Sequence, residues 1–162
     1  MEADPEPRWL EPDERETWMS LAALLMRLPG ALDAQLQRDA ALTHFEYLVL
    51  SGLSMAPERT MRMSDLAVAA EGSLPRLSQV VSRLEKRGWV RRFPDPADGR
   101  VTLAVLTDEG YAKVVAAAPG HVEAVRQLVF DPLTKPQRRQ LREIARRIMG
   151  AVDPGGHCPP SA

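Results

Sequence analysis

The stretch from residue 73 to residue 106 constrains the fold most, because a two-faced helix runs directly into a hairpin there. Ser73 can cap a helix, since its side-chain oxygen accepts a free N–H of the first turn, and Pro75 is tolerated that early. Gly88 supplies the left-handed residue that ends a helix. Between Ser73 and Gly88, apolar residues recur at helical spacing and define the face that should be buried. They are Leu77, Val80, Val81 and Leu84. The pattern predicts a helix over residues 74–87.

The opposite face of this predicted helix is polar. It combines cations, which suit phosphate groups, with short polar side chains, which suit the edges of bases. Its members are Arg76, Ser78, Gln79, Ser82, Arg83 and Lys86. Pro75, at the start of the helix, either touches a thymine methyl group or only shapes the turn. On the helix alone, a solvated basic face is an equal interpretation, because most runs of charge are simply exposed to water.

A basic hairpin follows the helix and favours DNA as the partner. Residues 89–93 are rich in strand-forming side chains, and the Asp-Gly pair at 98–99 is a strong hairpin-turn signal. Residues 101–106 then alternate branched apolar with smaller side chains. Arg91 and Arg92 alternate along the first strand, so at most one faces DNA and the other pairs with an acid. Together these elements predict a recognition helix with a two-stranded β-wing.

The chain before residue 73 is predicted to be helical after a short arm. Residues 1–12, with three prolines and several acids, are expected to form a flexible arm. An apolar stripe at three- and four-residue steps predicts a long helix in the region 13–42, which the Pro-Gly pair at 29–30 should break or bend. Thr43 and Glu46 form a capping box that opens the next helix.

The first half of a helix-turn-helix is expected just before residue 73. Residues 55–62 read as a loop, and Ser64 is expected to cap a short helix over residues 65–70. This short helix and the two-faced helix then make the helix-turn-helix.

Two further helices are predicted after the hairpin. Thr107 caps the first, in which the Pro-Gly pair at 119–120 should introduce a kink. Thr134 opens the second through a capping box. Residues 151–162 have no periodicity and are expected to form a disordered tail.

The predicted fold class is mainly α, or α+β. A winged helix-turn-helix lobe spans residues 43–106, and the flanking regions 13–42 and 107–150 carry apolar stripes that this small lobe could not fully cover. We therefore expect these flanking helices to interlock with a second copy of the chain as a dimerisation lobe.

Charge is distributed unevenly along the 162 residues, although the net charge is only −1. Residues 59–100 hold nine Arg or Lys against five acids, whereas residues 1–40 hold nine acids against four arginines. A local basic patch on a nearly neutral protein is enough to attract phosphate. There is no apolar run long enough to span a membrane and no signal peptide, and a single cysteine suits a reducing cytoplasm.

No metal site, cofactor or catalytic group is expected. The three histidines, at 44, 121 and 157, and Cys158 show no ligand spacing on a regular element, apart from the adjacent pair in the tail. There is no Gly-rich phosphate loop and no recognisable Ser/His/Asp arrangement, so the chain is not expected to be an enzyme.

Four short motifs resemble the MarR family of bacterial winged-helix transcription regulators, and the likeness extends over about residues 15–150. They are Ser-Asp-Leu-Ala at 64–67, Val-Ser-Arg-Leu-Glu-Lys-Arg-Gly at 81–88, Asp-Gly-Arg at 98–100 and Leu-Thr-Asp-Glu-Gly at 106–110. The resemblance implies a dimer formed by the first helix and the last two. It also implies that Arg100 reaches a minor groove, while Asp98 helps to hold the tip of the wing.

The resemblance leaves the effector open. Members of the family bind aromatic or phenolic molecules between the dimer helices and the DNA-binding lobe. Trp18, His44, Tyr47 and Tyr111 could line such a cleft, but each is equally well explained as a core residue. Some members sense peroxide through a cysteine near the start of the first helix, and this chain has none there.

The sequence thus predicts a dimeric, cytoplasmic, sequence-specific DNA-binding regulator, most simply a ligand-responsive repressor of a pseudo-palindromic operator. Its DNA-binding residues are expected to be Ser73, Pro75, Arg76, Ser78, Gln79, Ser82, Arg83, Lys86, Asp98 and Arg100. The alternative is a winged-helix module that binds another protein and not DNA. The operator, the regulated genes, the effector and the role of the tail with Cys158 stay open.

Overall fold

The computed structural model describes residues 6–154, which form a mostly helical molecule with a small antiparallel sheet. The α-helices are α1 (Pro12–Ala40), α2 (His44–Met55), α3 (Met63–Ala69), α4 (Leu74–Lys86), α5 (Asp108–Val125) and α6 (Lys135–Val152). The strands are β1 (Thr60–Arg62), β2 (Val90–Pro94) and β3 (Thr102–Leu106), in the order β1-β3-β2. A 3₁₀ turn, η1 (Pro57–Arg59), precedes β1, and a π-helical turn, η2 (Arg126–Phe130), follows α5.

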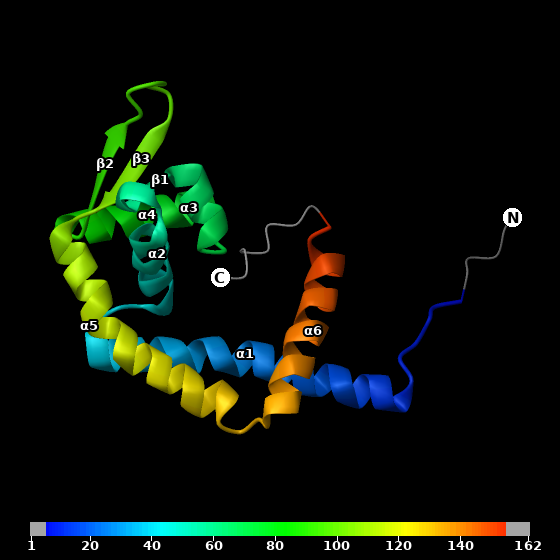
Figure 1. Ribbon diagram of the computed structural model, residues 1–162. Coiled ribbons are helices and arrows are strands. Elements are labelled where there is room, and N and C mark those ends of the chain that lie inside the picture. Colours follow the sequence, from blue (N-terminus) through cyan, green and yellow to red (C-terminus); the bar gives the residue numbers. More distant parts are fainter. Residues whose placement is uncertain (1–5, 155–162) are drawn as a thin grey trace, which may run out of the picture.

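A compact lobe is built from α2, α3, α4 and the sheet, with β2 and β3 rising from it as a wing (Figure 1). The apolar faces of these elements meet in one core, which also takes in the end of α1. Its largest fully buried side chains are Leu36, Leu42, Val49, Leu50, Leu53, Leu66, Leu77, Val81, Leu84 and Val90. The apolar face predicted for the residue 74–87 helix is therefore the face by which α4 is held in the lobe.

The helix caps follow the local sequence signals. Thr43 and Glu46 form the predicted capping box of α2, and Thr134 forms one with Gln137 at the start of α6. The Thr107 hydroxyl accepts a hydrogen bond from the Gly110 N–H at 3.0 Å. Gly88 has a φ of 75°, the left-handed conformation predicted for the residue that ends the recognition helix.

Neither internal proline ends its helix. Helix α1 continues through Pro29 and α5 continues through Pro119. Both rings lie on exposed faces, and α1 packs against α5 along this region. A proline in a helix interior costs about 3 kcal/mol, which the packing of these two long helices offsets. A π-helical turn, η2, follows α5.

The sheet contains one strand more than the sequence predicted. Residues 60–62 pair with β3 as β1, where a loop was expected. The strand is only three residues long, and it follows two non-glycine residues with positive φ, Glu58 and Arg59. The expected cap at Ser64 was also wrong: α3 begins at Met63, and the Ser64 hydroxyl donates to Asp65.

The long helices expose much apolar surface. Helix α6 has no buried residue, although Leu141, Ile144, Ile148 and Val152 lie along one side of it. Helix α1 likewise exposes Trp18, Met19, Leu24, Leu25 and Met26. Within residues 6–154, no helix is both long and apolar enough to cross a membrane.

Candidate nucleic-acid interface

Helix α4 presents a stripe of polar residues on the side facing away from the core. Successive residues of an α-helix turn by about 100°, so residues opposite the buried Leu77 and Leu84 recur at steps of three and four. This outward stripe consists of Pro75, Gln79, Ser82 and Lys86. All but the half-buried Ser82 are exposed, and the stripe is therefore the part of α4 best placed to meet a groove of DNA.

Two arginines flank the stripe on the side towards α2, and both already have partners. The Arg76 guanidinium carbon lies 4.1 Å from the centroid of the Phe45 ring. Arg83 Nε lies 3.6 Å from a carboxylate oxygen of Glu46, which is only 3% exposed. Glu46 also accepts a hydrogen bond from the Thr43 N–H at 2.9 Å. These contacts hold the two cations at the edge of α4, so they suit phosphate better than base edges.

Ser78 lies on the other flank, towards β2, and Ser82 is the member of the outward stripe next to that flank. Arg92 of β2 donates to the Ser82 hydroxyl at 2.9 Å and to the Ser78 hydroxyl at 3.4 Å. It also donates to both carboxylate oxygens of Glu85, through its main-chain N–H at 3.0 Å and its Nε at 3.0 Å. These bonds lower the pKa of the Glu85 carboxyl from its ordinary value, although partial burial opposes them. Arg92 is thus the member of the Arg91–Arg92 pair that binds an acid, and Arg91 is exposed.

The tip of the wing is organised by Asp98. Its carboxylate accepts from Arg100 Nε at 3.0 Å, from Arg100 Nη2 at 3.2 Å and from the Arg100 main-chain N–H at 3.1 Å. The side-chain bonds are the main reason that the pKa of Asp98 lies below its ordinary value. The Arg100 side chain is 91% exposed, so it stands out into solvent while the Nε–Nη2 edge of its guanidinium group is held by the aspartate.

A second basic residue reaches the wing from β1. Arg62 Nη2 lies 3.8 Å from a carboxylate oxygen of Asp95, a contact that crosses β3. Sequence reasoning had placed Arg62 in a loop and gave it no role. Its position depends on β1, which is only three residues long and therefore too short to be predicted as a strand from its sequence.

The residues predicted to bind DNA fall into three groups. Ser73 is the N-cap of α4 and accepts from the Arg76 N–H at 3.4 Å. Pro75, Gln79 and Lys86 of the outward stripe, the two α2-facing arginines, Asp98 and Arg100 are surface groups of one lobe, whereas Ser78 and Ser82 hydrogen-bond to Arg92. The sequence predicted that one of Arg91 and Arg92 pairs with an acid, but it did not identify Glu85 as that acid, because Glu85 belongs to a different element and no short sequence motif links the two.

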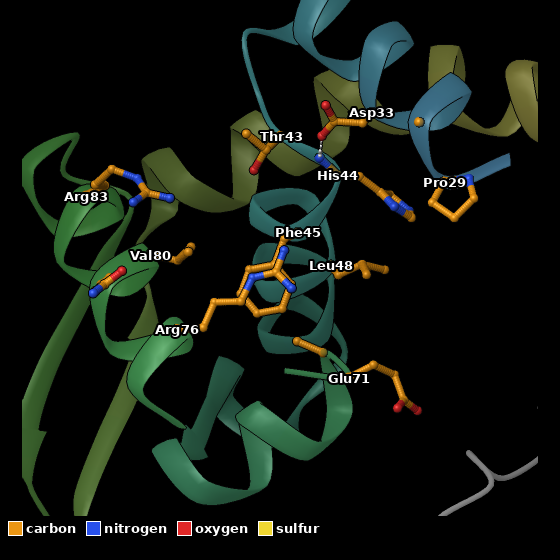
Figure 2. A pocket seen from close by; sticks show the side chains of 13 residues that line it. Pro29, Asp33, Thr43, His44, Phe45, Leu48, Glu71, Arg76, Val80 and Arg83 are labelled. Atoms are coloured by element: carbon orange, nitrogen blue, oxygen red, sulfur yellow. Dashed lines mark hydrogen bonds between the residues drawn. The ribbon is translucent and has the colours of Figure 1, made fainter. Parts of the chain in front are cut away.

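A cavity of about 800 Å³ opens between α1, α2 and α4, beside the α2-facing arginines. Figure 2 shows Arg76 and Phe45 together on one side of it and His44 and Asp33 on another, joined by the 2.7 Å hydrogen bond from the His44 main-chain N–H. Of the four aromatic residues considered for an effector cleft, only His44 lines this cavity.

The other three aromatic residues lie elsewhere. Tyr47 is buried against His121, with ring centroids 4.5 Å apart, and Tyr111 lies under the Arg59 guanidinium at 3.7 Å. Trp18 is exposed on α1. Trp18, Tyr47 and Tyr111 therefore do not line the cavity beside Arg76.

The histidine pair occupies the junction between the lobe and the long helices. The rings of His44 and His121 have centroids 5.8 Å apart. Burial lowers the pKa of both imidazoles, and the proximity of His44 lowers that of His121 further. No cluster of three His, Cys, Asp or Glu residues suited to a metal occurs between residues 6 and 154. His157 and Cys158 lie outside the described residues.

Comparisons with known proteins match the chain to winged helix-turn-helix regulators. The model of the MarR family matches residues 42–102. Among curated relatives, the uncharacterised HTH-type transcriptional regulator YdcH of Bacillus subtilis is 34% identical over 98 residues, covering 59% of this chain and 66% of that protein. Transcriptional regulator HosA of Escherichia coli O111:H- is 31% identical over 110 residues, covering 68% of this chain and 79% of its own length. The chain spans only part of some curated relatives: 43% of PecS of Dickeya dadantii and 60% of the transcriptional repressor MprA of Escherichia coli K12.

A solved structure gives the fuller match. Sco3205 of Streptomyces coelicolor, a MarR family transcriptional regulator determined in complex with DNA, is 47% identical, with a TM-score of 0.86. The alignment covers 91% of this chain and 92% of that one. With a winged helix-turn-helix lobe, a matching family model and this degree of identity, the chain belongs to the MarR family of transcriptional regulators.

Proposed function

We propose that the protein is a dimeric, sequence-specific DNA-binding regulator in which each subunit places α4 in a major groove and its wing in the flanking minor groove. The observation that carries this proposal is the joint exposure, on one lobe, of the outward stripe of α4 and of Arg100 at the wing tip. A major groove is wide enough for an α-helix, and the negative potential of a narrow minor groove attracts arginine.

Different residues of the lobe serve different parts of DNA. Gln79 is central in the outward stripe and exposed, so it is the residue we assign to base reading, where glutamine pairs best with adenine. Lys86 in the stripe, with Arg76 and Arg83 beside it, contacts phosphate and sets the position of the helix on the duplex. The Asp98 contacts limit the directions in which Arg100 can extend.

The dimer is proposed from the apolar surface of the long helices. An α-helix in water is stable mainly when an apolar face packs against something, and no residue of the α6 face is buried within the described chain. A second copy supplies the same apolar side chains from α1 and α6. Two-fold symmetry then calls for a pseudo-palindromic operator with half-sites about one helical turn apart.

We further propose repression by promoter occlusion and its relief by a small molecule. The cavity lined by His44, Phe45 and Arg76 lies between α1 of the dimerisation region and α4 of the DNA-binding lobe. A ligand there can favour one spacing of the two recognition helices over another, with a coupling of about 1–3 kcal/mol. A DNA-binding regulator of this kind acts where the chromosome is, in the bacterial cytoplasm.

Binding-site selection from random duplex DNA, repeated at several salt concentrations, tests the proposal. An enriched palindrome bound with a steep salt dependence is the expected result, because cations on the protein replace counterions of the phosphates. Weak binding without sequence enrichment would contradict it. A shallow salt dependence of binding to a protein partner would instead favour a winged-helix module that recognises protein.

A further inference from the structure

Arg92 ties the recognition helix to the wing more tightly than its place in the sequence suggests. Its guanidinium group reaches Ser78, Ser82 and Glu85, which lie one turn apart along the same flank of α4. Its main-chain N–H adds the bond to Glu85. A single side chain of β2 therefore spans most of the length of α4.

The surroundings of Arg92 argue against a direct role in binding phosphate. Its side chain is only 28% exposed, and its charge is opposed by the Glu85 carboxylate, which is itself 29% exposed. A planar guanidinium group that already donates to a carboxylate and to two hydroxyls has few donors left for a ligand. Arg91, the next residue along β2, is exposed and has no such partner among the described residues.

We infer that Arg92 is a positioning residue, which together with Glu85 fixes the orientation of the wing relative to α4. This inference rests on the proposed DNA binding. Gln79 and Arg100 are to read two different grooves of one duplex, so their separation has to match the distance between those grooves. Binding groups work best when a supporting shell holds them in place, and the Arg92 clamp is the link between the elements that carry these two residues.

Two conservative substitutions separate this role from a direct phosphate contact. In Glu85→Gln, one of the two acceptor oxygens becomes an amide donor, so the clamp loosens while the charge of Arg92 is kept and a negative charge is removed. Arg92→Lys keeps the cation but loses the planar fork. A positioning role predicts about tenfold weaker operator binding for both variants, as expected for the loss of one hydrogen bond to a charged group. A phosphate contact predicts unchanged or tighter binding for Glu85→Gln and near-normal binding for Arg92→Lys.

Glu109→Gln provides the matched control. Glu109 is exposed in the first turn of α5 and lines the same surface pocket as Glu85, so its substitution removes one negative charge nearby without touching the clamp. Its operator affinity should be unchanged or slightly higher. Thermal unfolding of all variants checks that binding is measured on folded protein. If the folded clamp variants bind operator as well as the parent does, the clamp serves stability alone and the inference is wrong.

A double-mutant cycle with Arg100→Ala gives the sharper readout. If the clamp holds the wing in place, Arg100→Ala should cost at least threefold less affinity in the Glu85→Gln background than in the parent. Equal losses in the two backgrounds would overturn the inference, because the wing would then act independently of Arg92.

A measurement without DNA keeps the inference separate from the proposed function. Spin labels at residues 79 and 99, in a chain with Cys158 replaced by serine, report the distance between α4 and the wing tip. Glu85→Gln should broaden this distance distribution, whereas Glu109→Gln should not. An unchanged distribution would overturn the inference, while failure of the unlabelled parent to select any operator would count against the proposed function alone.

Discussion

Gly110, in the first turn of α5, packs so closely against the main-chain carbonyl of Trp89 that a β-carbon at residue 110 would overlap with that carbonyl. The same junction is tied by Thr107, which donates through its main-chain N–H to Trp89 O at 3.0 Å and through its hydroxyl to Gly88 O at 2.7 Å. The end of the recognition helix, the root of the wing and the start of α5 are thereby fixed to one another.

Gly110→Ala should destabilise the protein by about 3 kcal/mol, because the obstacle is backbone that cannot swing aside. Chemical denaturation monitored by circular dichroism measures the change. Gly99→Ala at the wing tip is the matched control, since a β-carbon there meets nothing within 4 Å. It should shift the unfolding free energy by no more than about 0.5 kcal/mol. Equal effects of the two substitutions would mean that the junction tolerates a shift of α5.

Arg100→Ala should weaken operator binding by about 1–3 kcal/mol and leave the fold intact, because its side chain is 91% exposed. Fluorescence anisotropy with labelled operator measures the affinity. Arg27→Ala, on an exposed part of α1, removes the same charge far from the wing and should have little effect. Unchanged affinity for Arg100→Ala would remove the wing tip from the recognition mechanism.

Ile148→Glu should dissociate the proposed dimer, because it places a charge in the apolar face of α6 that we expect to be buried between subunits. Sedimentation velocity reports the oligomeric state. Arg146→Glu, about 160° around α6 from Ile148 and exposed, makes an even larger change in charge and should leave the dimer intact. Truncation before Thr134 should also give monomers, and a stable dimer of the truncated chain would place the interface elsewhere.

The histidine pair should make stability depend on pH. Burial lowers the pKa of His44 and of His121 in the folded state, with the Asp33 carboxylate partly opposing the shift at His44. The unfolded chain then binds more protons than the folded chain below the ordinary histidine pKa of about 6.5, so the free energy of unfolding falls as pH drops through that value.

Denaturation of the parent and of His121→Phe at a series of pH values between about 5 and 7 measures this dependence. The substitution should make the free energy of unfolding depend less on pH, because it removes one of the two histidines whose pKa is lowered by folding. It breaks no hydrogen bond at His121 Nδ1, since that atom has no partner among the described residues. Glu85 and Asp98, whose pKa values are also lowered, lose their contribution only at more acidic pH. Parallel profiles for the two proteins would show that the histidines do not control stability in this range.

Features that depend on residues close together in the sequence were predictable from it. The caps at Thr43, Thr107 and Thr134 depend on residues three apart, and the buried face of α4 depends on helical spacing alone. The four family motifs led to the winged-helix fold, and membership of a family of DNA-binding regulators confirms that the chain is not an enzyme.

Features that depend on distant partners were not predictable. Pro29 and Pro119 lie within continuous helices because α1 and α5 pack together. Strand β1 forms because residues 60–62 pair with β3, which lies much further along the chain, at residues 102–106. Ser78 and Ser82 have the residue type and spacing of base-reading groups, and the sequence did not show that Arg92, from another element, donates a hydrogen bond to each hydroxyl. The sequence pattern identifies which side of α4 is exposed, whereas the neighbouring strand determines which side chains on that side already have a hydrogen-bond partner.

The buried carboxylate of Glu46 has a consequence for how operator preference can change during evolution. Because it caps α2 and faces Arg83, a substitution at residue 83 leaves a nearly buried charge less well compensated, and such charges are costly. Gln79 has no tie of this kind to the core. If Gln79 reads bases as proposed, a change of target sequence at residue 79 leaves this buried charge undisturbed, whereas a change at residue 83 leaves Glu46 to the more distant Arg87, whose Nη1 lies 3.9 Å away.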